Sequence, residues 1–166
     1  KITSFAKKLC GKNRPGHFES VADVIDRFLF IIKPKFIYLG MKDFQQVRVI
    51  EDYIKKRNYK TKVIECKIIR EKNGLAYSSR NSLLSSKEKY IGSLIYNLIL
   101  KNKKNIITKS FSLNKLKKII YQFGAKKIEY IKILDINNFW HLRKKNKNYR
   151  IFIAYYLGDT RLIDNI

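Results

Sequence analysis

Residues 38–46, YLGMKDFQQ, place a cluster of polar side chains directly after a short apolar run. Lys42 offers a compact positive charge for phosphate oxygens, and the carboxylate of Asp43 accepts hydrogen bonds from hydroxyl groups. Gly40 allows a ligand to approach the backbone closely, and the amide of Gln46 both donates and accepts hydrogen bonds. These residue types together predict a site for a ligand that carries phosphates and hydroxyl groups.

A simpler interpretation of this cluster exists. Asp43 and Gln46 also fit a capping-box-like pair that begins a helix, and capping can coexist with ligand contact. A second polar segment, YSSRN at residues 77–81, supplies hydroxyl groups and a guanidinium. Taken alone, such a string is more often an ordinary loop.

The elements around the first cluster alternate in type. Apolar residues at helical spacing predict a helix over 21–32, followed by a buried strand at 36–39. Helical spacing returns over 43–57, and 62–69 reads as a second strand. Strand, helix and strand form a βαβ unit with a parallel sheet and a right-handed crossover. Because ligands of open α/β sheets collect beyond the carboxyl ends of the strands, the polar cluster sits where a site is expected.

The pattern changes after the turn dipeptide Asn73-Gly74. The following segments are predicted to be a helix over 85–101 capped by Ser85 and Glu88, a helix over 112–123 between Ser112 and Gly124, and strands at 126–136, 149–158 and 160–166. The predicted fold class is α/β: residues 1–69 are part of a parallel-sheet domain, and residues 70–166 are a small α+β domain with an antiparallel sheet.

Composition narrows the class of protein. Cys10 and Cys66 belong to no CxxC pattern, which indicates a reduced, cytoplasmic compartment, and neither a zinc site nor a disulfide scaffold. The longest apolar runs fall far below the roughly 20 residues that cross a bilayer. A net charge of +24 raises nucleic-acid binding as an alternative. The 28 Lys against 9 Arg fit a lysine-rich surface equally well, and no aromatic-basic motif accompanies the charge.

Four segments carry a family resemblance: RPGHFESVADVI, YLGMKDFQQVRVI, IIREKNGLAYSSRNSLLS and LGDTRLIDNI. In order and spacing they resemble the pantothenate synthetases, or pantoate:beta-alanine ligases. The resemblance implies a cytoplasmic, homodimeric, ATP-dependent ligase with a Rossmann-like nucleotidyltransferase domain. It implies that magnesium and ATP activate pantoate as pantoyl adenylate, and that beta-alanine then displaces AMP.

The resemblance also assigns residues. It implies that ATP contacts Gly40, Met41, Lys42, Asp43, Ile69, Tyr77, Ser78, Ser79 and Arg80, and that Gln46 binds pantoate. YSSRN corresponds to a mobile phosphate-binding signature for the leaving pyrophosphate. Ile69 stands where the family contacts adenine through the main chain, with Tyr77 beside the base. Lys42, Ser78 and Arg80 are the residues predicted to act in catalysis.

Several features depart from the family pattern. Met41 replaces a typical acidic residue, and Tyr77 replaces a methionine. Nothing matches the family's amino-terminal histidine motif, its first pocket glutamine or its magnesium-associated acid, so no residue is predicted to bind metal. We therefore expect the chain to be the carboxyl-terminal portion of such an enzyme, either an incomplete record or one piece of a split enzyme. This portion is expected to be inactive alone and to expose one side of its parallel sheet. A degenerate remnant with weak nucleotide binding is the alternative.

Two histidines lie outside these clusters. Arg14 and His17 in RPGHF can line the pocket, but His17 equally fits a packing or hydrogen-bonding residue at a helix start. His141 has no motif context and is expected to be structural or exposed.

Overall fold

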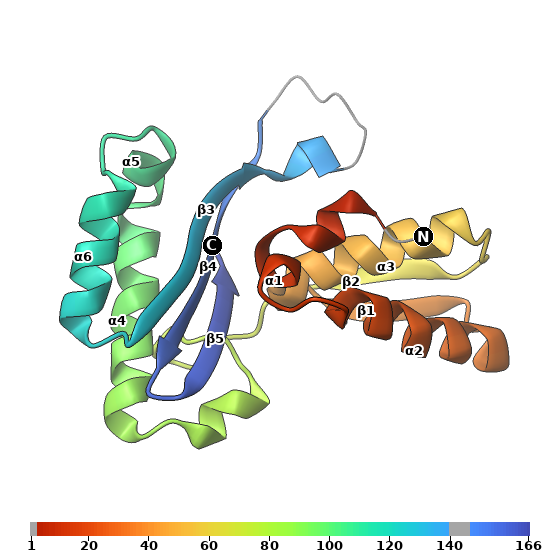
Figure 1. The fold of residues 1–166 in the computed structure, drawn as a ribbon, viewed down its shortest axis with the longest axis horizontal. Coiled ribbons are helices and arrows are strands. Elements are labelled where there is room, and N and C mark those ends of the chain that lie inside the picture. Colours follow the sequence, from red (N-terminus) through yellow and green to blue (C-terminus); the bar gives the residue numbers. More distant parts are fainter. Residues whose placement is uncertain (1–2, 140–146) are drawn as a thin grey trace. The chain divides into compact units, whose positions relative to one another are not determined.

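A computed structural model of the chain describes residues 3–139 and 147–166. The chain divides into two compact units, Lys1–Ile68 and Ile69–Ile166. Each unit has its own sheet and its own helices, coloured from red to yellow and from yellow-green to blue in Figure 1. The predicted assignment of residues 1–69 and 70–166 to two domains of a ligase stays a prediction.

The first unit contains the predicted βαβ element. Its elements are a 3₁₀ turn at Ser4–Lys7, α1 (Leu9–Lys12), α2 (His17–Ile32), β1 (Phe36–Gly40), a 3₁₀ turn at Met41–Asp43, α3 (Phe44–Lys56) and β2 (Lys62–Cys66). β1 and β2 are parallel, with Phe36 paired to Lys62 and Gly40 paired to Cys66. Helix α2 begins four residues before the predicted start at 21, because Gly16 adopts the left-handed conformation that allows the chain to enter the helix at His17.

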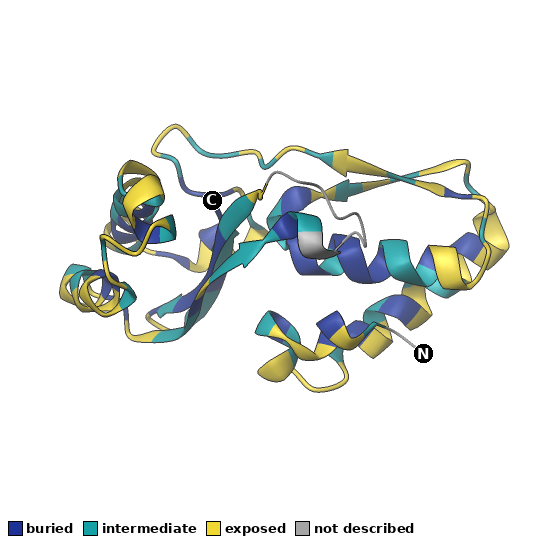
Figure 2. Cartoon of the chain, turned by 90° about the horizontal axis from the view of Figure 1, so that it is seen from above, coloured by how far each residue is buried: buried dark blue, intermediate teal, exposed yellow. Residues whose placement is uncertain are grey.

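Helices α2 and α3 cover one face of this sheet. Leu29, Ile50 and Ile54 form a buried cluster against the partly buried strand residues Ile37 and Val63. The alternate residues of the strands point the other way, and Tyr38 is 67% exposed and Ile64 36% exposed. Helix α2 also carries an exposed apolar stripe, formed by Val24, Phe28 and Ile31. Figure 2 colours the chain by burial, with exposed residues in yellow and buried residues in dark blue. The expectation that this chain alone exposes one side of its parallel sheet is confirmed.

The second unit is an α+β arrangement. Its elements are a 3₁₀ helix at Ser79–Leu83, α4 (Ser86–Lys101), α5 (Lys103–Ile107), α6 (Leu113–Phe123), β3 (Lys127–Asp135), a 3₁₀ turn at Ile136–Phe139, β4 (Tyr149–Leu157) and β5 (Thr160–Asn165). The three strands form an antiparallel sheet in the order β3, β4, β5. The α/β fold class, with a parallel unit followed by an α+β unit with an antiparallel sheet, is confirmed.

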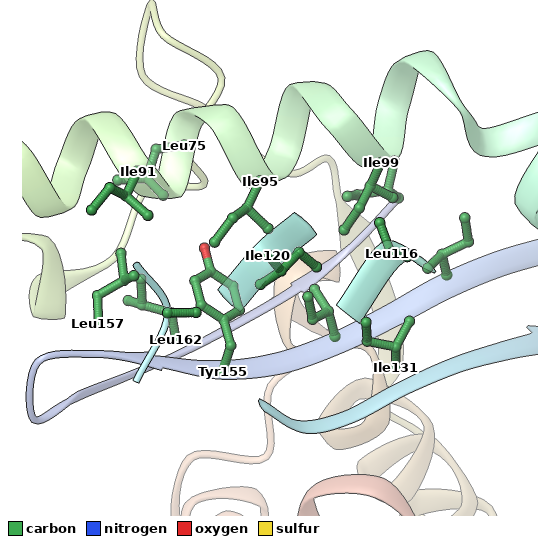
Figure 3. Close-up of a cluster of buried hydrophobic side chains, with 14 of the residues drawn as sticks. Leu75, Ile91, Ile95, Ile99, Leu116, Ile120, Ile131, Tyr155, Leu157 and Leu162 are labelled. Atoms are coloured by element: carbon green, nitrogen blue, oxygen red, sulfur yellow. The ribbon is translucent and has the colours of Figure 1, made fainter. Parts of the chain in front are cut away.

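Helices α4 and α6 bury their apolar faces against this sheet. Ile95 and Ile99 of α4 point toward the sheet together with Ile120 of α6, and the ring of Tyr155 from β4 reaches into the same cluster (Figure 3). Because this layer of aliphatic side chains is fully buried, it supplies the main hydrophobic stabilisation of the unit. It forms a firm support for the loops that precede α4.

The predicted helix caps of this unit are confirmed. The Ser85 hydroxyl accepts from the Glu88 amide, and the Glu88 carboxylate accepts from the Ser85 amide, which is a complete capping box. The Ser112 side chain accepts from the amide of Lys115, and Gly124 ends α6 in the left-handed conformation. Local sequence therefore fixes both ends of α6 and the start of α4.

Candidate functional site

Gly40 marks the carboxyl end of the parallel sheet. Its φ of −72° is open to any residue, so the backbone conformation does not require glycine here. A Cβ built on Gly40 would meet no heavy atom within 4 Å beyond its chain neighbours. The fold therefore leaves open space above this residue, as the close approach of a ligand requires.

Lys42 and Asp43 follow in the short 3₁₀ turn. The Lys42 ammonium lies 3.7 Å from a carboxylate oxygen of Asp43, and the Lys42 side chain is 17% exposed. Asp43 occupies the position before α3, but its carboxylate makes no capping hydrogen bond. The interpretation of Asp43 and Gln46 as a capping pair is wrong, because α3 begins directly from the 3₁₀ turn and the Asp43 backbone lies outside the usual extended cap conformation. The carboxylate of Asp43 stays half-exposed beside a cation.

Met41, one of the expected departures from the family pattern, is buried. Its side chain packs into the first unit, so only its main chain can contact a ligand at this strand end. The first charged side chain of the turn is therefore Lys42.

The two adjacent glutamines have different roles. Gln45 is buried, and its amide donates to the carbonyl oxygens of Phe5 and Lys8 at 2.8 and 2.7 Å and accepts from the Cys10 amide at 3.0 Å. It holds the first residues of the chain against α3. Gln46 is half-buried, and its side chain makes no hydrogen bond within the described part of the chain. The amide of Gln46 is therefore available to a ligand.

Ile69 and Tyr77 lie opposite each other in a short hairpin at the start of the second unit. The Tyr77 amide donates to the Ile69 carbonyl at 2.9 Å, and Arg70 bridges to Ala76 in antiparallel fashion. Both side chains are exposed, at 66% and 62%. The predicted strand at 62–69 is thus too long: β2 ends at Cys66, because Ile69 pairs within the hairpin and not with the parallel sheet. The hairpin makes an exposed apolar pair from residues eight apart in sequence.

Arg70 anchors this hairpin to the sheet of the second unit. Its guanidinium donates to both carboxylate oxygens of Asp164 at 2.7 and 2.9 Å and stacks over the Tyr96 ring at 4.1 Å. At the turn, Gly74 has a φ of +93°, and a Cβ there would lie 2.4 Å from the Tyr96 ring. Glycine is required at this position by both conformation and space.

Ser78, Ser79 and Arg80, called the loop of the site from here on, follow the hairpin and are exposed or half-exposed. Ser78 caps the 3₁₀ helix Ser79–Leu83, whose first two residues are Ser79 and Arg80. The Ser78 hydroxyl accepts from the Arg80 amide at 3.3 Å, and its own proton remains a donor. The described residues offer the Arg80 guanidinium no ion-pair partner. The loop therefore presents hydroxyl groups and a cation to solvent.

An open depression of about 430 Å³ adjoins this loop. It is lined by Arg70, Glu71, Lys72, Asn73 and Tyr77. Tyr77 is the one predicted site residue in its lining. The depression lies entirely on the hairpin, and Asn73 shapes it by accepting the Leu75 amide at 3.0 Å.

The predicted site residues fall into two groups. Gly40 to Gln46 gather at the carboxyl end of the parallel sheet in the first unit, and Ile69 with residues 77–80 gathers around the hairpin of the second. The first group offers a cation, a carboxylate and an amide, and the second offers a cation, hydroxyl groups and an apolar pair. Such groups suit a polyanion that also carries hydroxyl groups and an aromatic ring. That both groups contact one nucleotide stays a prediction.

Other candidates take ordinary roles or lie outside the structure described. Arg14 and His17 form an exposed side-chain hydrogen bond of 2.9 Å at the start of α2. His141 lies outside the described residues. Within residues 3–139 and 147–166, no group of three or more His, Cys, Asp or Glu side chains could hold a metal ion. The same residues include no helix long and apolar enough to cross a membrane.

The sequence patterns missed the residues that support the two groups. These residues are polar, and each makes hydrogen bonds or an ion pair to a residue of another element. They are Gln45, Arg70 and Asn81. In the sequence they could be seen only as polar residues within the segments that resemble the family. Their partners were not recognisable from local spacing.

Comparison with known proteins identifies the family. A sequence model described as Pantoate-beta-alanine ligase matches residues 1–166. The pantothenate synthetase of Sulfurihydrogenibium sp. (strain YO3AOP1) is 37% identical over 170 residues, which cover 99% of this chain and 61% of that protein. The chain therefore spans about three fifths of that curated relative's length.

Two solved structures match as well. A pantoate-beta-alanine ligase from Francisella tularensis, complexed with Beta-gamma ATP and Beta-alanine, is 38% identical with a TM-score of 0.80, over 99% of this chain and 55% of that one. The pantothenate synthetase of Thermus thermophilus is 25% identical with a TM-score of 0.84, over 100% and 63% of the two chains. These matches confirm the resemblance carried by the four segments. The chain belongs to the pantoate-beta-alanine ligase family.

Proposed function

We propose that the chain is the carboxyl-terminal part of an enzyme that joins pantoate to beta-alanine at the expense of ATP. A carboxylate oxygen of pantoate attacks the α-phosphorus of ATP, the bond to pyrophosphate breaks, and pantoyl adenylate forms. The amine of beta-alanine then attacks the activated carbonyl, AMP leaves, and pantothenate is released. The family match over the whole chain and the ATP and beta-alanine bound by the Francisella relative support this proposal.

The first unit would hold the nucleotide and the acid that it activates. Lys42 neutralises phosphate oxygens, while the open space above Gly40 admits the ribose and phosphates against the backbone. The half-exposed carboxylate of Asp43 accepts from ribose hydroxyl groups. The amide of Gln46, which the fold leaves without a partner among the described residues, binds pantoate.

The second unit would hold the base and the leaving group. The main chain of Ile69 and the exposed ring of Tyr77 flank adenine. Ser78, Ser79 and Arg80 donate to the pyrophosphate oxygens as negative charge moves onto them. The catalytic roles fall to Lys42, Ser78 and Arg80, since these residues contact the charge that develops in the transition state.

Further properties belong to this proposal. The complete enzyme is a cytoplasmic homodimer, and ATP is its substrate. The family resemblance implies Mg²⁺, but the described residues include no cluster that fits a protein-held ion, so no step is assigned to it. This chain alone holds only part of the site and does not complete the reaction.

The observation that carries the proposal is the set of groups at the carboxyl end of the parallel sheet: the Lys42–Asp43 ion pair, the Gln46 amide and the open space above Gly40. Asp43 caps nothing, Gln46 bonds to nothing described, and Gly40 is demanded neither by conformation nor by space. Helix capping and backbone conformation therefore do not account for these residues. Their placement at the carboxyl end of a parallel sheet is the placement that ligand sites favour.

The test uses a hybrid enzyme, defined as this chain joined to the part of the Sulfurihydrogenibium protein that it does not match. We expect the hybrid to release pyrophosphate in a pantoate-dependent manner. Lys42→Ala and Arg80→Ala should each slow this release by about 100-fold, the scale of one lost transition-state charge contact.

Matched controls are Lys60→Ala and Arg27→Ala, which remove exposed cations from the first unit and should keep the rate of the unmodified hybrid. Unchanged rates in Lys42→Ala and Arg80→Ala would remove the site assignment. A folded hybrid without activity would favour the degenerate remnant.

A further inference from the structure

Asn81 connects the candidate phosphate loop to the hairpin that precedes it. The residue is 5% exposed and lies in the 3₁₀ helix Ser79–Leu83, which also contains Ser79 and Arg80. One side-chain N–H donates to the Ala76 carbonyl at 3.1 Å, and the other donates to a carboxylate oxygen of Glu71 at 2.7 Å. Both acceptors belong to the hairpin, so a single amide bonds to both of its strands.

The loop between these contacts is short. At its start, the Tyr77 amide is bonded to the Ile69 carbonyl, and at its end the Asn81 side chain returns to the same hairpin. Ser78 to Arg80 therefore lie in a three-residue span whose two ends are fixed on one support. The main-chain amide of Asn81 also donates to the Ser78 carbonyl at 3.0 Å, which closes the span from within.

The two hydrogen bonds made by the Asn81 side chain depend on its amide group. The side-chain amide has two N–H protons, so it can donate to a carbonyl and to a carboxylate at once. An aspartate of the same shape would place a carboxylate against two acceptors. The carbonyl oxygen of the Asn81 side chain is buried without a hydrogen-bond partner in the described structure, so the side chain is held by its donors alone.

We propose that Asn81 is a positioning residue, whose side-chain amide clamps Ser78, Ser79 and Arg80 to the hairpin that carries Ile69 and Tyr77. It contacts no substrate. The clamp presents the loop's donors in one arrangement before the ligand arrives, which lowers the ordering cost of binding. This inference rests on the proposed function for the identity of the ligand, but the clamp itself is a property of the free chain.

Amide hydrogen exchange of the ligand-free full chain tests the clamp. In Asn81→Ala and Asn81→Asp, exchange at the amides of residue 81 and Leu84 should accelerate by roughly 10- to 100-fold, since the loop opens without the loss of the sheet. The amides of Ile151 and Ile166, which bond β4 to the chain end, should keep their rates. The inference would be overturned if exchange accelerated equally at the amides of residue 81 and Leu84 and at those of Ile151 and Ile166. It would also be overturned if exchange at residue 81 and Leu84 did not accelerate at all.

Three further variants make the test specific. Glu71→Gln keeps a carbonyl oxygen as acceptor and should retain most of the protection, whereas Glu71→Ala should lose part of it. Ser82→Ala is the control within the same 3₁₀ helix, where the exposed Ser82 hydroxyl donates only to the Ser79 carbonyl. Protection that is the same in the unmodified chain and in all five variants would contradict the clamp.

The consequence for activity is measured in the hybrid enzyme. Asn81→Asp should lower kcat/KM for ATP by roughly 10- to 100-fold and leave the KM for beta-alanine unchanged, because only the phosphate loop is affected. An unmodified hybrid without activity would contradict the proposed function and leave the exchange result standing. Normal exchange in Asn81→Ala would contradict the clamp and leave the proposed function standing.

Discussion

Replacing Gly40 by alanine separates what the fold needs from what the proposed ligand needs. A methyl group here meets no atom within 4 Å, and the φ of −72° suits alanine without strain. Because alanine loses less chain entropy on folding, the free energy of unfolding should rise by about 0.4–1 kcal/mol. In the hybrid enzyme the same methyl occupies space that the nucleotide needs, at a cost of about 1–3 kcal/mol, or roughly 5- to 150-fold in the KM for ATP.

Gly74→Ala is the matched control with the opposite expectation. The φ of +93° and a Cβ 2.4 Å from the Tyr96 ring should lower the free energy of unfolding by about 2–5 kcal/mol, as the sum of left-handed strain and overpacking. Urea unfolding followed by circular dichroism gives both stabilities, and initial rates of pyrophosphate release give the KM. A destabilised Gly40→Ala, or one with an unchanged KM for ATP, would refute the reasoning.

Two other predictions concern the support of the second unit. Arg70→Met leaves the Asp164 carboxylate, whose side chain is 10% exposed, without its cation and should cost about 3–5 kcal/mol in urea unfolding. Adding Asp164→Asn should recover part of that loss, and an equal loss in both proteins would show that the pair is not coupled. The Ser85 amide holds the pKa of Glu88 below its usual range, so the carboxylate's stabilisation is complete at neutral pH and is lost as the pH falls through the lowered pKa. Glu88→Gln should unfold with a smaller acid-dependent loss than the unmodified chain, and identical pH profiles would contradict this.

Local patterns predicted most of the fold. The capping box of Ser85 and Glu88 and the glycine stop at 124 were recognisable because each involves residues within one turn of helix. The βαβ element followed from apolar spacing, since α3 and the two strands bury only one face each. The end of β2 was misplaced because Ile68 and Ile69 are strong strand formers, but β2 ends at Cys66 and Ile69 pairs within the hairpin.

The support of the site could not be predicted in the same way. Arg70 and Asp164 are 94 residues apart, and the Gln45 amide meets a carbonyl 40 residues away. The spacing of residues in the sequence cannot predict such pairs, because they depend on how whole elements pack together. The Asp43 and Gln46 spacing fitted a cap, but α3 begins from the 3₁₀ turn and the Asp43 carboxylate makes no capping hydrogen bond. Types of residue indicated the chemistry, while long-range contacts decided which of them are structural.

A crystal structure of the hybrid enzyme with bound ATP tests the central claim most directly. The account predicts that the Lys42 ammonium and the Arg80 guanidinium both contact phosphate oxygens of the same nucleotide, with the base between the Ile69 main chain and Tyr77. A bound nucleotide that touches only one of the two residue groups, with the other turned toward solvent, would contradict it.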